Sequence, residues 1–141
     1  MTPEESYEVV ASARSVTMKL LFWEALVGLI LFDLVVRHRD FSTMLRFVRT
    51  RKVASRAPSA EIVGRVCTAL NSACVWYPKS VPCLQRSAVG VCLLRHCGIA
   101  AKMVIGVRVM PLLAHAWIEV DGKVVNDVPR VQQYYRYLTS N

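Results

Sequence analysis

The chain has 141 residues, 54% of them hydrophobic, and a net charge of +8 from 18 basic and 10 acidic residues. This length suits a single domain over 1–141, and the hydrophobic content excludes a disordered chain. Basic residues are densest from Arg37 to Arg56, but no aromatic interleaving or nucleic-acid motif accompanies them, so the sequence argues against a nucleic-acid-binding protein.

The N-terminal part, residues 1–57, is predicted to be helical, ahead of a core over 58–141. Glu4 and Glu5 suit the first turn of a long helix. His38 and Asp40 mark a break, after which a second amphipathic helix begins at Phe41.

The apolar stretch from Leu20 to Val36 lies within the first helix. Its longest run without a charge, Ala25 to Phe32, has eight residues, whereas a membrane span needs about 20. The stretch also begins too late and lacks the cleavage site of a secretory signal. We therefore expect no transmembrane span, and a helix that packs on the core or on a partner protein; a helix lying in a membrane surface is the alternative.

Two further helices are predicted between residues 59 and 98. Ser59 is placed to cap the first of them. Ser80 is placed to cap the second, which puts Cys83 near its third position, and Gly98 suits its C-terminal end. Because Gly90 lacks a side chain, a strand or another helix is expected to approach this second helix closely.

Three strands are predicted after residue 100, where the apolar period changes. Val104–Val109 is rich in β-branched residues, His115–Val120 follows, and Lys123–Val128 comes after a turn at Asp121-Gly122. The tail from Gln132 to Leu138 is expected to add a short helix or strand. These elements predict an α+β fold, with N-terminal helices and a central cysteine-bearing helix packed on a small antiparallel sheet.

The chain contains five cysteines. Without an export signal they indicate a reducing compartment, and we expect a cytoplasmic protein. Their spacing lacks the close pairs of a zinc site, so no metal is expected. Three of them lie among Val, Ala and Leu, where cysteine usually packs as a small apolar residue: Cys67, Cys74 and Cys92.

Three residues of the core can form a nucleophilic site: Cys83, His115 and Asp127. A thiol attacks a carbonyl carbon as its thiolate, a form that a helix N-terminus and a neighbouring imidazole both favour. Cys83 lies in the first turn of a predicted helix, His115 begins a strand, and Asp127 lies on the strand after the turn. They can supply a nucleophile, its base and the carboxylate that orients the base, and so predict a cysteine-dependent acyl-transfer enzyme.

The position of Asp127 depends on the length of the turn, because a shift of one residue points every side chain of a strand to the other face. A two-residue turn pairs Val120 with Lys123 and points Asp127 away from His115. A three-residue turn pairs Glu119 with Lys123 and His115 with Asp127, and also sets opposite charges across the strands. We therefore predict the three-residue turn.

Other residues compete for roles at this site. Asn126 can orient a histidine but faces away in the predicted register, and Asp121, beside a glycine, is expected to shape the turn. The backbone N–H of Cys83 is the expected donor to an oxyanion, while the second donor stays open between Gln85 and the loop from Trp76 to Ser80.

Four segments between roughly residues 60 and 130 carry a further signal: Cys83-Leu84-Gln85-Arg86-Ser87; Leu93-Leu94-Arg95 with Gly98-Ile99; Val104-Ile105-Gly106-Val107; and His115-Ala116-Trp117-Ile118-Glu119-Val120-Asp121-Gly122. In combination they resemble the lasso-peptide leader peptidases of the transglutaminase-like superfamily. The resemblance implies a transglutaminase-like or papain-like core that needs no cofactor. It also implies that Cys83 attacks a peptide bond, His115 transfers the proton and Asp127 orients His115.

The resemblance implies partners as well. The substrate would be a precursor peptide whose N-terminal leader is removed, so that a separate cyclase can close the freed core peptide. Family members are either fused to a leader-recognition domain or borrow one from a small separate protein, and the helical first 60 residues favour the second arrangement. The apolar stretch from Leu20 to Val36 and the basic stripe would then be docking surfaces for the recognition protein, the cyclase or the leader.

Three other functions stay open from the sequence. The same three residues can pass an acyl group to an amine instead of water, which would make the protein a transamidating acyltransferase. A non-catalytic adaptor that holds a peptide is the second, and the presence of Cys83, His115 and Asp127 argues against it. A membrane-surface protein that uses its apolar helix is the third.

Overall fold

The structure is a computed structural model that describes residues 3–40, 42, 43, 46, 48, 59–128 and 130–140, with side chains described between residues 17 and 138. In the described part of the chain the long helices come first and the strands of a four-stranded sheet follow. This arrangement confirms the predicted α+β fold. In chain order the elements are α1 (Pro3–His38), α3 (Ala60–Trp76), α4 (Cys83–His96), β1 (Ala101–Arg108), β2 (Leu113–Val120), β3 (Lys123–Val124), α5 (Val131–Tyr134) and β4 (Arg136–Ser140).

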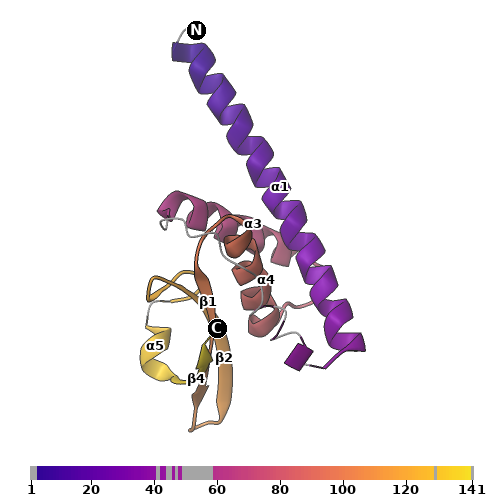
Figure 1. The fold of residues 1–141 in the computed structure, drawn as a ribbon, viewed down its shortest axis with the longest axis vertical. Helices are drawn as coiled ribbons and strands as arrows, with labels where there is room; N and C mark the ends of the chain where they lie inside the picture. Colours follow the sequence, from indigo (N-terminus) through magenta and orange to yellow (C-terminus); the bar gives the residue numbers. More distant parts are fainter. Residues whose placement is uncertain are drawn as a thin grey trace.

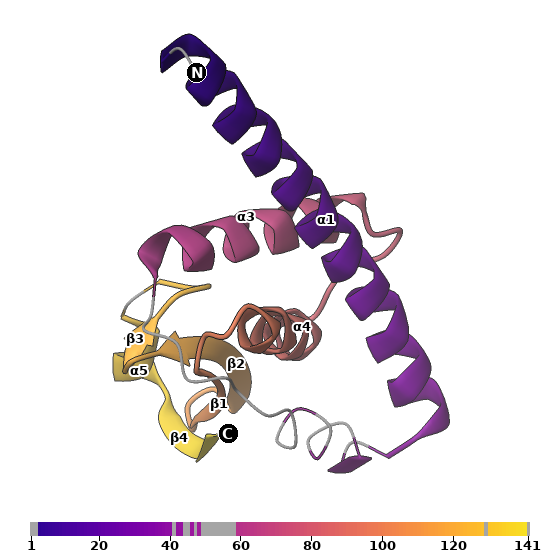
Figure 2. The same ribbon diagram turned by 45° about the horizontal axis from the view of Figure 1, so that its top comes forward.

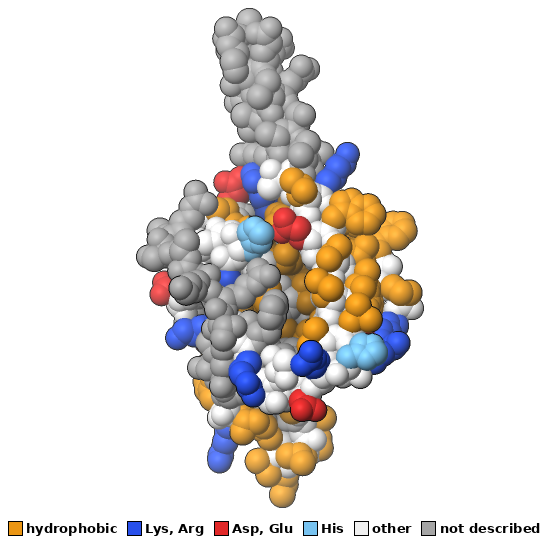
Figure 3. Space-filling model, turned by 45° about the vertical axis from the view of Figure 1, so that its right-hand side comes forward, with side chains coloured by type: hydrophobic (Ala, Val, Ile, Leu, Met, Phe, Trp, Pro, Cys, Tyr) orange, Lys and Arg blue, Asp and Glu red, His pale blue; other side chains and the backbone are white. Residues whose placement is uncertain are grey.

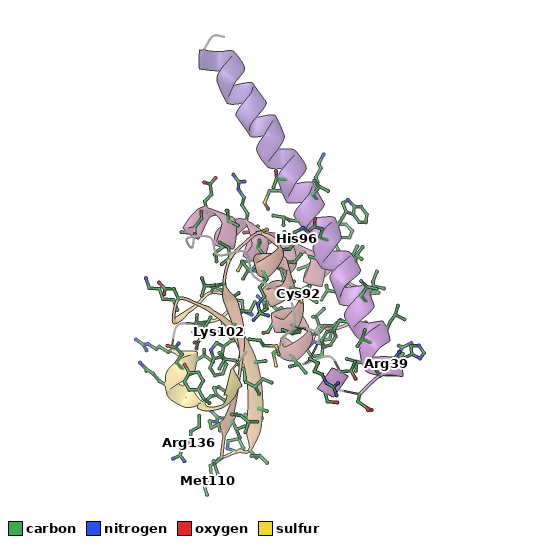
Figure 4. All side chains as sticks on the ribbon, viewed as in Figure 1. Arg39, Cys92, His96, Lys102, Met110 and Arg136 are labelled. Atoms are coloured by element: carbon green, nitrogen blue, oxygen red, sulfur yellow. The ribbon has the colours of Figure 1, made fainter. Side chains whose placement is uncertain are left out.

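The four strands form one antiparallel sheet in the order β3-β2-β1-β4. β1 and β2 pair over their whole lengths, from Ala101 opposite Val120 to Arg108 opposite Leu113. They make the long hairpin of Figure 1, and Figure 4 labels Met110 at its tip. The predicted tail forms both a short helix, α5, and an edge strand, β4, which pairs with β1.

α4 occupies the centre of the fold, between the sheet and the other helices, as Figure 2 shows. It contacts α1, α3, β1 and β2. A Cβ atom at Gly90 would lie 2.4 Å from Cδ1 of Ile118 on β2 and 2.9 Å from Cδ2 of Leu70 on α3, so a side chain at this position would collide with both. The predicted close approach at Gly90 is therefore confirmed.

The ends of the helices follow local signals, with one exception. Ser59 caps α3 by accepting a hydrogen bond from the backbone N–H of Ile62, and Gly98 follows α4 with a φ of 83°, both as predicted. Ser80, by contrast, does not cap α4. Pro82 is the N-cap with an extended ψ of 154°, so the helix begins two residues later than predicted and Cys83 is its first residue, not its third.

α1 ends at His38, where the break was predicted. The second predicted helix, from Phe41, lies largely outside the described residues. Leu21, Ala25 and Leu29 bury one side of the C-terminal half of α1 in the core. The N-terminal half projects beyond the rest of the domain, as Figures 1 and 2 show. Among the described residues, no helix combines the length and the apolar character needed to cross a membrane.

The C-terminal half of α1 also holds the loop that leads into α4. The Gln85 side chain donates a hydrogen bond of 2.9 Å to the Leu29 carbonyl, and the Lys79 ammonium lies 3.0 Å from the Asp33 carboxylate. The Tyr77 hydroxyl donates to the same carboxylate. This hydrogen bond, helped by Lys79, outweighs burial and holds the pKa of Asp33 below its ordinary value. α1 therefore fixes both the loop and the first turn of the helix that follows.

The turn between β2 and β3 differs from the prediction. It contains two residues, Asp121 with φ of 52° and Gly122 with φ of 74°, so Val120 pairs with Lys123. Positive φ at both positions is the conformation that Asp-Gly favours in two-residue hairpins. The observed register also keeps Val120 buried in the strand, whereas a three-residue turn would place this apolar side chain in a loop. The predicted pairing of Glu119 with Lys123 is therefore wrong.

Candidate active site

A pocket of about 180 Å³ lies where the start of α4, the start of β2 and the bend after β3 meet. Its lining includes the three residues that the sequence singled out, Cys83, His115 and Asp127. Cys83 is half-buried at the first position of α4, where backbone N–H groups have no partner within the helix. These three residues, which lie up to 44 positions apart in the chain, thus share one cavity.

His115 and Asp127 are in direct contact through Nε2 of the imidazole and Oδ2 of the carboxylate. The other carboxylate oxygen, Oδ1, accepts a hydrogen bond of 2.7 Å from the backbone N–H of Val128, so both oxygens are held. A neutral imidazole that donates from Nε2 has its lone pair on Nδ1. The contact with Asp127 therefore leaves Nδ1 as the nitrogen that can accept a proton.

Asp127 reaches His115 by a route that the predicted register did not contain. In the observed register a longer β3 would set Val128 opposite His115 and point Asp127 to the other face of the sheet. β3 instead ends at Val124, well short of the predicted end, and residues 125–127 form a bend. The contact arises because the strand ends early.

The Asn126 side chain takes the place of a hydrogen bond of the β2–β3 ladder where β3 ends. Its Oδ1 accepts a hydrogen bond of 2.7 Å from the backbone N–H of Ile118, which a strand carbonyl would otherwise bind, and its Nδ2 donates to Ser87 Oγ at 3.3 Å. Ser87 is fully buried and donates to the Ala116 carbonyl at 3.1 Å. The amide thus ties the bend to β2 and α4, and it lines the pocket.

The prediction that Asn126 faces away from the site is therefore wrong. The Asn126-Asp127 pair directly after a short strand was the available signal, because asparagine often supplies side-chain hydrogen bonds at turns. Ser87 had no such signal, since its partners lie far away in the sequence.

The candidates for a second oxyanion donor differ in whether they line the pocket. The Gln85 side chain is buried and its amide binds the Leu29 carbonyl on α1, so it does not line the pocket. Of the segment that precedes α4, Val81 lines the pocket, whereas Trp76 is exposed. Arg86 also lines it; its guanidinium binds Asn71, and its buried Nε has no hydrogen-bond partner among the described residues.

The His115 ring lies against two aromatic side chains. Its centroid is 6.1 Å from that of Trp117 and 5.5 Å from that of Tyr135. The fully buried Trp117 donates from Nε1 to Oε1 of Glu119 at 2.8 Å. The same oxygen accepts two further hydrogen bonds, from Gln132 and Tyr137. Burial alone would raise the pKa of Glu119, but these hydrogen bonds outweigh it, so the pKa lies below its ordinary value.

The other cysteines lie elsewhere. Burial raises the pKa of Cys67 and Cys74, against a smaller opposing effect of Arg86, and Cys67 donates to the Val125 carbonyl at 3.5 Å. Cys92, labelled in Figure 4, lies nine residues after Cys83 on α4, roughly 13 Å along the helix axis. No disulfide joins any of the five cysteines, all of which are described. No cluster of three or more metal-ligating side chains occurs in the described part of the chain.

Residues 28–140 match the family model of the transglutaminase-like superfamily. A 50-residue stretch is 42% identical to the microcin J25-processing protein McjB of Escherichia coli; it covers 36% of this chain and 24% of that protein. No solved structure matches the chain. Because the family model covers most of the sequence and the fold is α+β with a cysteine at the start of its central helix, the chain belongs to the transglutaminase-like superfamily.

Proposed function

We propose that this protein is a cysteine peptidase that removes the leader from the precursor of a lasso peptide. Membership of the transglutaminase-like superfamily supports a cysteine-dependent reaction at a carbonyl group. The similarity to a protein that processes microcin J25 supports a peptide precursor as the substrate. The observation that carries the proposal is the pocket that Cys83 shares with His115, whose Nε2 binds Asp127.

In the first step the Cys83 sulfur attacks the carbonyl carbon between leader and core peptide. Its proton passes to Nδ1 of His115, and Asp127 stabilises the resulting imidazolium through Nε2. The tetrahedral intermediate then collapses, the C–N bond breaks, and Nδ1 returns the proton to the leaving amine. The core peptide departs with a new amino terminus, while the leader remains as a thioester on Cys83.

In the second step water hydrolyses this thioester. Nδ1 of His115 takes one proton from the water as its oxygen bonds to the carbonyl carbon, and the C–S bond breaks. The proton goes to the sulfur, and the leader leaves as a carboxylic acid. Both steps build negative charge on the carbonyl oxygen, and the N–H of Cys83 at the first position of α4 is suited to stabilise it because helix N-termini favour anions.

The proposal includes partners and a compartment. The precursor peptide is the substrate, a small separate protein supplies leader recognition, and the cyclase that acts next on the core peptide is a further partner. A thiolate nucleophile stays active in a reducing compartment, which is why we place the reaction in the cytoplasm.

The test is mass spectrometry of a lasso-peptide precursor after incubation with the native chain, with and without a small leader-binding protein. We expect cleavage at one bond, addition of one water to the products, and no cleavage by the Cys83→Ala variant. The matched control is Cys92→Ala, which removes a thiol from the same helix outside the pocket and should leave turnover close to that of the native chain.

Other outcomes identify the alternatives. If the leader is joined to an amine instead of gaining a hydroxyl, the protein is a transamidating acyltransferase on the same fold. If native chain and Cys83→Ala bind the precursor equally and neither cleaves it, the protein is an adaptor. Equal loss of turnover in Cys83→Ala and Cys92→Ala would contradict the special role of Cys83.

A further inference from the structure

α1 has a second apolar side that nothing in the described structure covers. Its core side carries the buried Leu21, Ala25 and Leu29. A different set of large apolar side chains remains between 46% and 60% exposed on the same helix: Leu20, Trp23, Val27, Ile30, Leu31, Leu34 and Val36. Five of them follow one line along the helix, and we call these five the outer seam of α1: Leu20, Trp23, Val27, Ile30 and Leu34. Figure 3 shows hydrophobic side chains gathered on the side of the molecule that α1 covers.

The spacing of the outer seam is that of a coiled coil. Its members follow one another by three, four, three and four residues, which is the alternation of the a and d positions of a heptad. With 3.6 residues per turn, this places the seam on the side of the helix opposite the core. In the sequence the same spacing continues toward the N-terminus through Val16, Ala13 and Val9. Scattered exposed apolar residues would not keep this period from Leu20 to Leu34.

The length of α1 also supports the packing of a further helix on the outer seam. The helix has 36 residues, and its N-terminal half projects beyond the other elements in Figures 1 and 2. Helices in water gain most of their stability from packing an apolar face, so a long helix with an apolar stripe is expected to lie against another helix.

The charges beside the outer seam indicate which helix packs against it. If Leu20 is an a position, Lys19 is the g position before it and Glu24 is the e position that follows Trp23. In a parallel pair of identical helices in register, a g residue contacts the e residue five positions later on the partner, so Lys19 of each copy meets Glu24 of the other. Both side chains are exposed, and neither makes an ion pair within the described residues. The seam is therefore complementary to itself.

We infer that the outer seam of α1 binds a second copy of this chain as a parallel two-helix coiled coil. The two catalytic domains then lie on opposite sides of the pair, because the seam faces away from the core that each α1 covers. This arrangement leaves the pocket at the start of α4 open in both copies, and it is independent of the reaction proposed for that pocket.

The first test measures the mass of the full chain by sedimentation over a range of concentrations. We expect a monomer–dimer equilibrium, weakened by at least about tenfold in Val27→Lys and in Ile30→Lys, because each puts a charge into the seam. Val75→Lys is the matched control: this valine is also apolar and exposed, but it lies on α3 outside the seam, so the variant should dimerise like the native chain. Circular dichroism checks that the variants are folded.

The second test reverses the charges beside the seam. It leaves the apolar seam residues unchanged, so it still applies if the seam variants do not fold. Lys19→Glu and Glu24→Lys should each weaken dimerisation by roughly tenfold, since each turns two attractive contacts into repulsive ones. Mixing the two variants should restore it, because every contact in the mixed dimer joins opposite charges.

Several results would overturn the inference. They are a native chain that stays monomeric at every concentration, equal dimerisation of Val27→Lys and native chain, or no recovery when the two charge variants are mixed. Flotation of monomers with phosphatidylglycerol vesicles would assign the seam to a membrane surface instead.

Discussion

Replacing Asn126 with alanine separates the geometry of the pocket from the chemistry of its three residues. The substitution removes the hydrogen bonds to the Ile118 N–H and to Ser87 Oγ. Ile118 is fully buried, so an unpaired N–H there costs about 1–3 kcal/mol, and the lost bond to Ser87 costs about 0.5–1.5 kcal/mol. We expect the free energy of unfolding to fall by about 2–4 kcal/mol.

The effect on turnover follows from the path of the chain. Without the Asn126 amide, nothing ties the bend after β3 to Ile118 and Ser87, so Asp127 is no longer held in its position against His115. A displacement of about 1 Å in a catalytic group can cost about 10²-fold in rate. Under the proposed mechanism we therefore expect kcat for precursor cleavage to fall by about 10²-fold. KM should change little, because the variant displaces the partner of His115 and removes no side chain to which the proposal assigns substrate binding.

The assay combines urea unfolding with cleavage kinetics on the precursor peptide. Gln132→Ala is the matched control, because this side chain is also a half-buried amide with two hydrogen bonds, to Glu119 and to the Gly122 carbonyl. It lies outside the pocket, so the variant should lose stability without a comparable loss of kcat. If Asn126→Ala keeps the native kcat while it loses stability, Asn126 does not position Asp127 and the reasoning is refuted.

Three further predictions concern thiols and pH. Cys83→Ala should abolish cleavage with an unchanged circular dichroism spectrum, whereas Cys92→Ala should keep turnover and lose about 1 kcal/mol of stability by urea unfolding; the opposite ranking would contradict the site. Limited alkylation at neutral pH, followed by peptide mapping, should modify Cys67 and Cys74 slowly, because burial raises their pKa and keeps them protonated; alkylation of both at the rate of a free cysteine in a peptide would contradict this. Glu119→Gln should make the free energy of unfolding depend less on pH in the acidic range. The lowered pKa of Glu119 means that its carboxylate stabilises the fold fully above its unfolded value near 4.5 and loses this contribution as the pH falls through the lower folded value. The stability difference from the native chain should therefore be full at neutral pH and shrink below about pH 4.5, and a difference that grows on acidification would contradict the assignment.

The parts of the fold that the sequence predicted are those that local chemistry decides. The cap at Ser59, the left-handed residue at Gly98 and the close contact at Gly90 each depend on one residue type at one position. Ser80 was misleading because it is a good cap residue, yet Pro82 adopts an extended conformation that delays the helix to Cys83. The prediction therefore placed Cys83 in the correct turn but at the wrong position.

Support that comes from distant elements was beyond the sequence. Gln85 binds the Leu29 carbonyl, 56 residues earlier, and Tyr77 binds Asp33, 44 residues earlier. Local patterns carry no information about such partners, so Gln85 was considered for the pocket when its role is to hold α4 against α1. Ser87 was missed for the same reason.

The contact between His115 and Asp127 exposes the limit of reasoning from strand parity. Parity assumes that a strand continues, and on this assumption the two-residue turn excludes the contact. The local turn signal at Asp121-Gly122 was nevertheless correct, and the contact is present because Asn126 ends the strand by offering its side chain where the backbone carbonyl would bind. A short hairpin with a tight turn can therefore deliver a carboxylate to the facing strand when the residue before the acid can take over a ladder hydrogen bond. It follows that Asn126 constrains the site as much as the turn does, and that a search for such pairs should examine the residue before the acid together with the register.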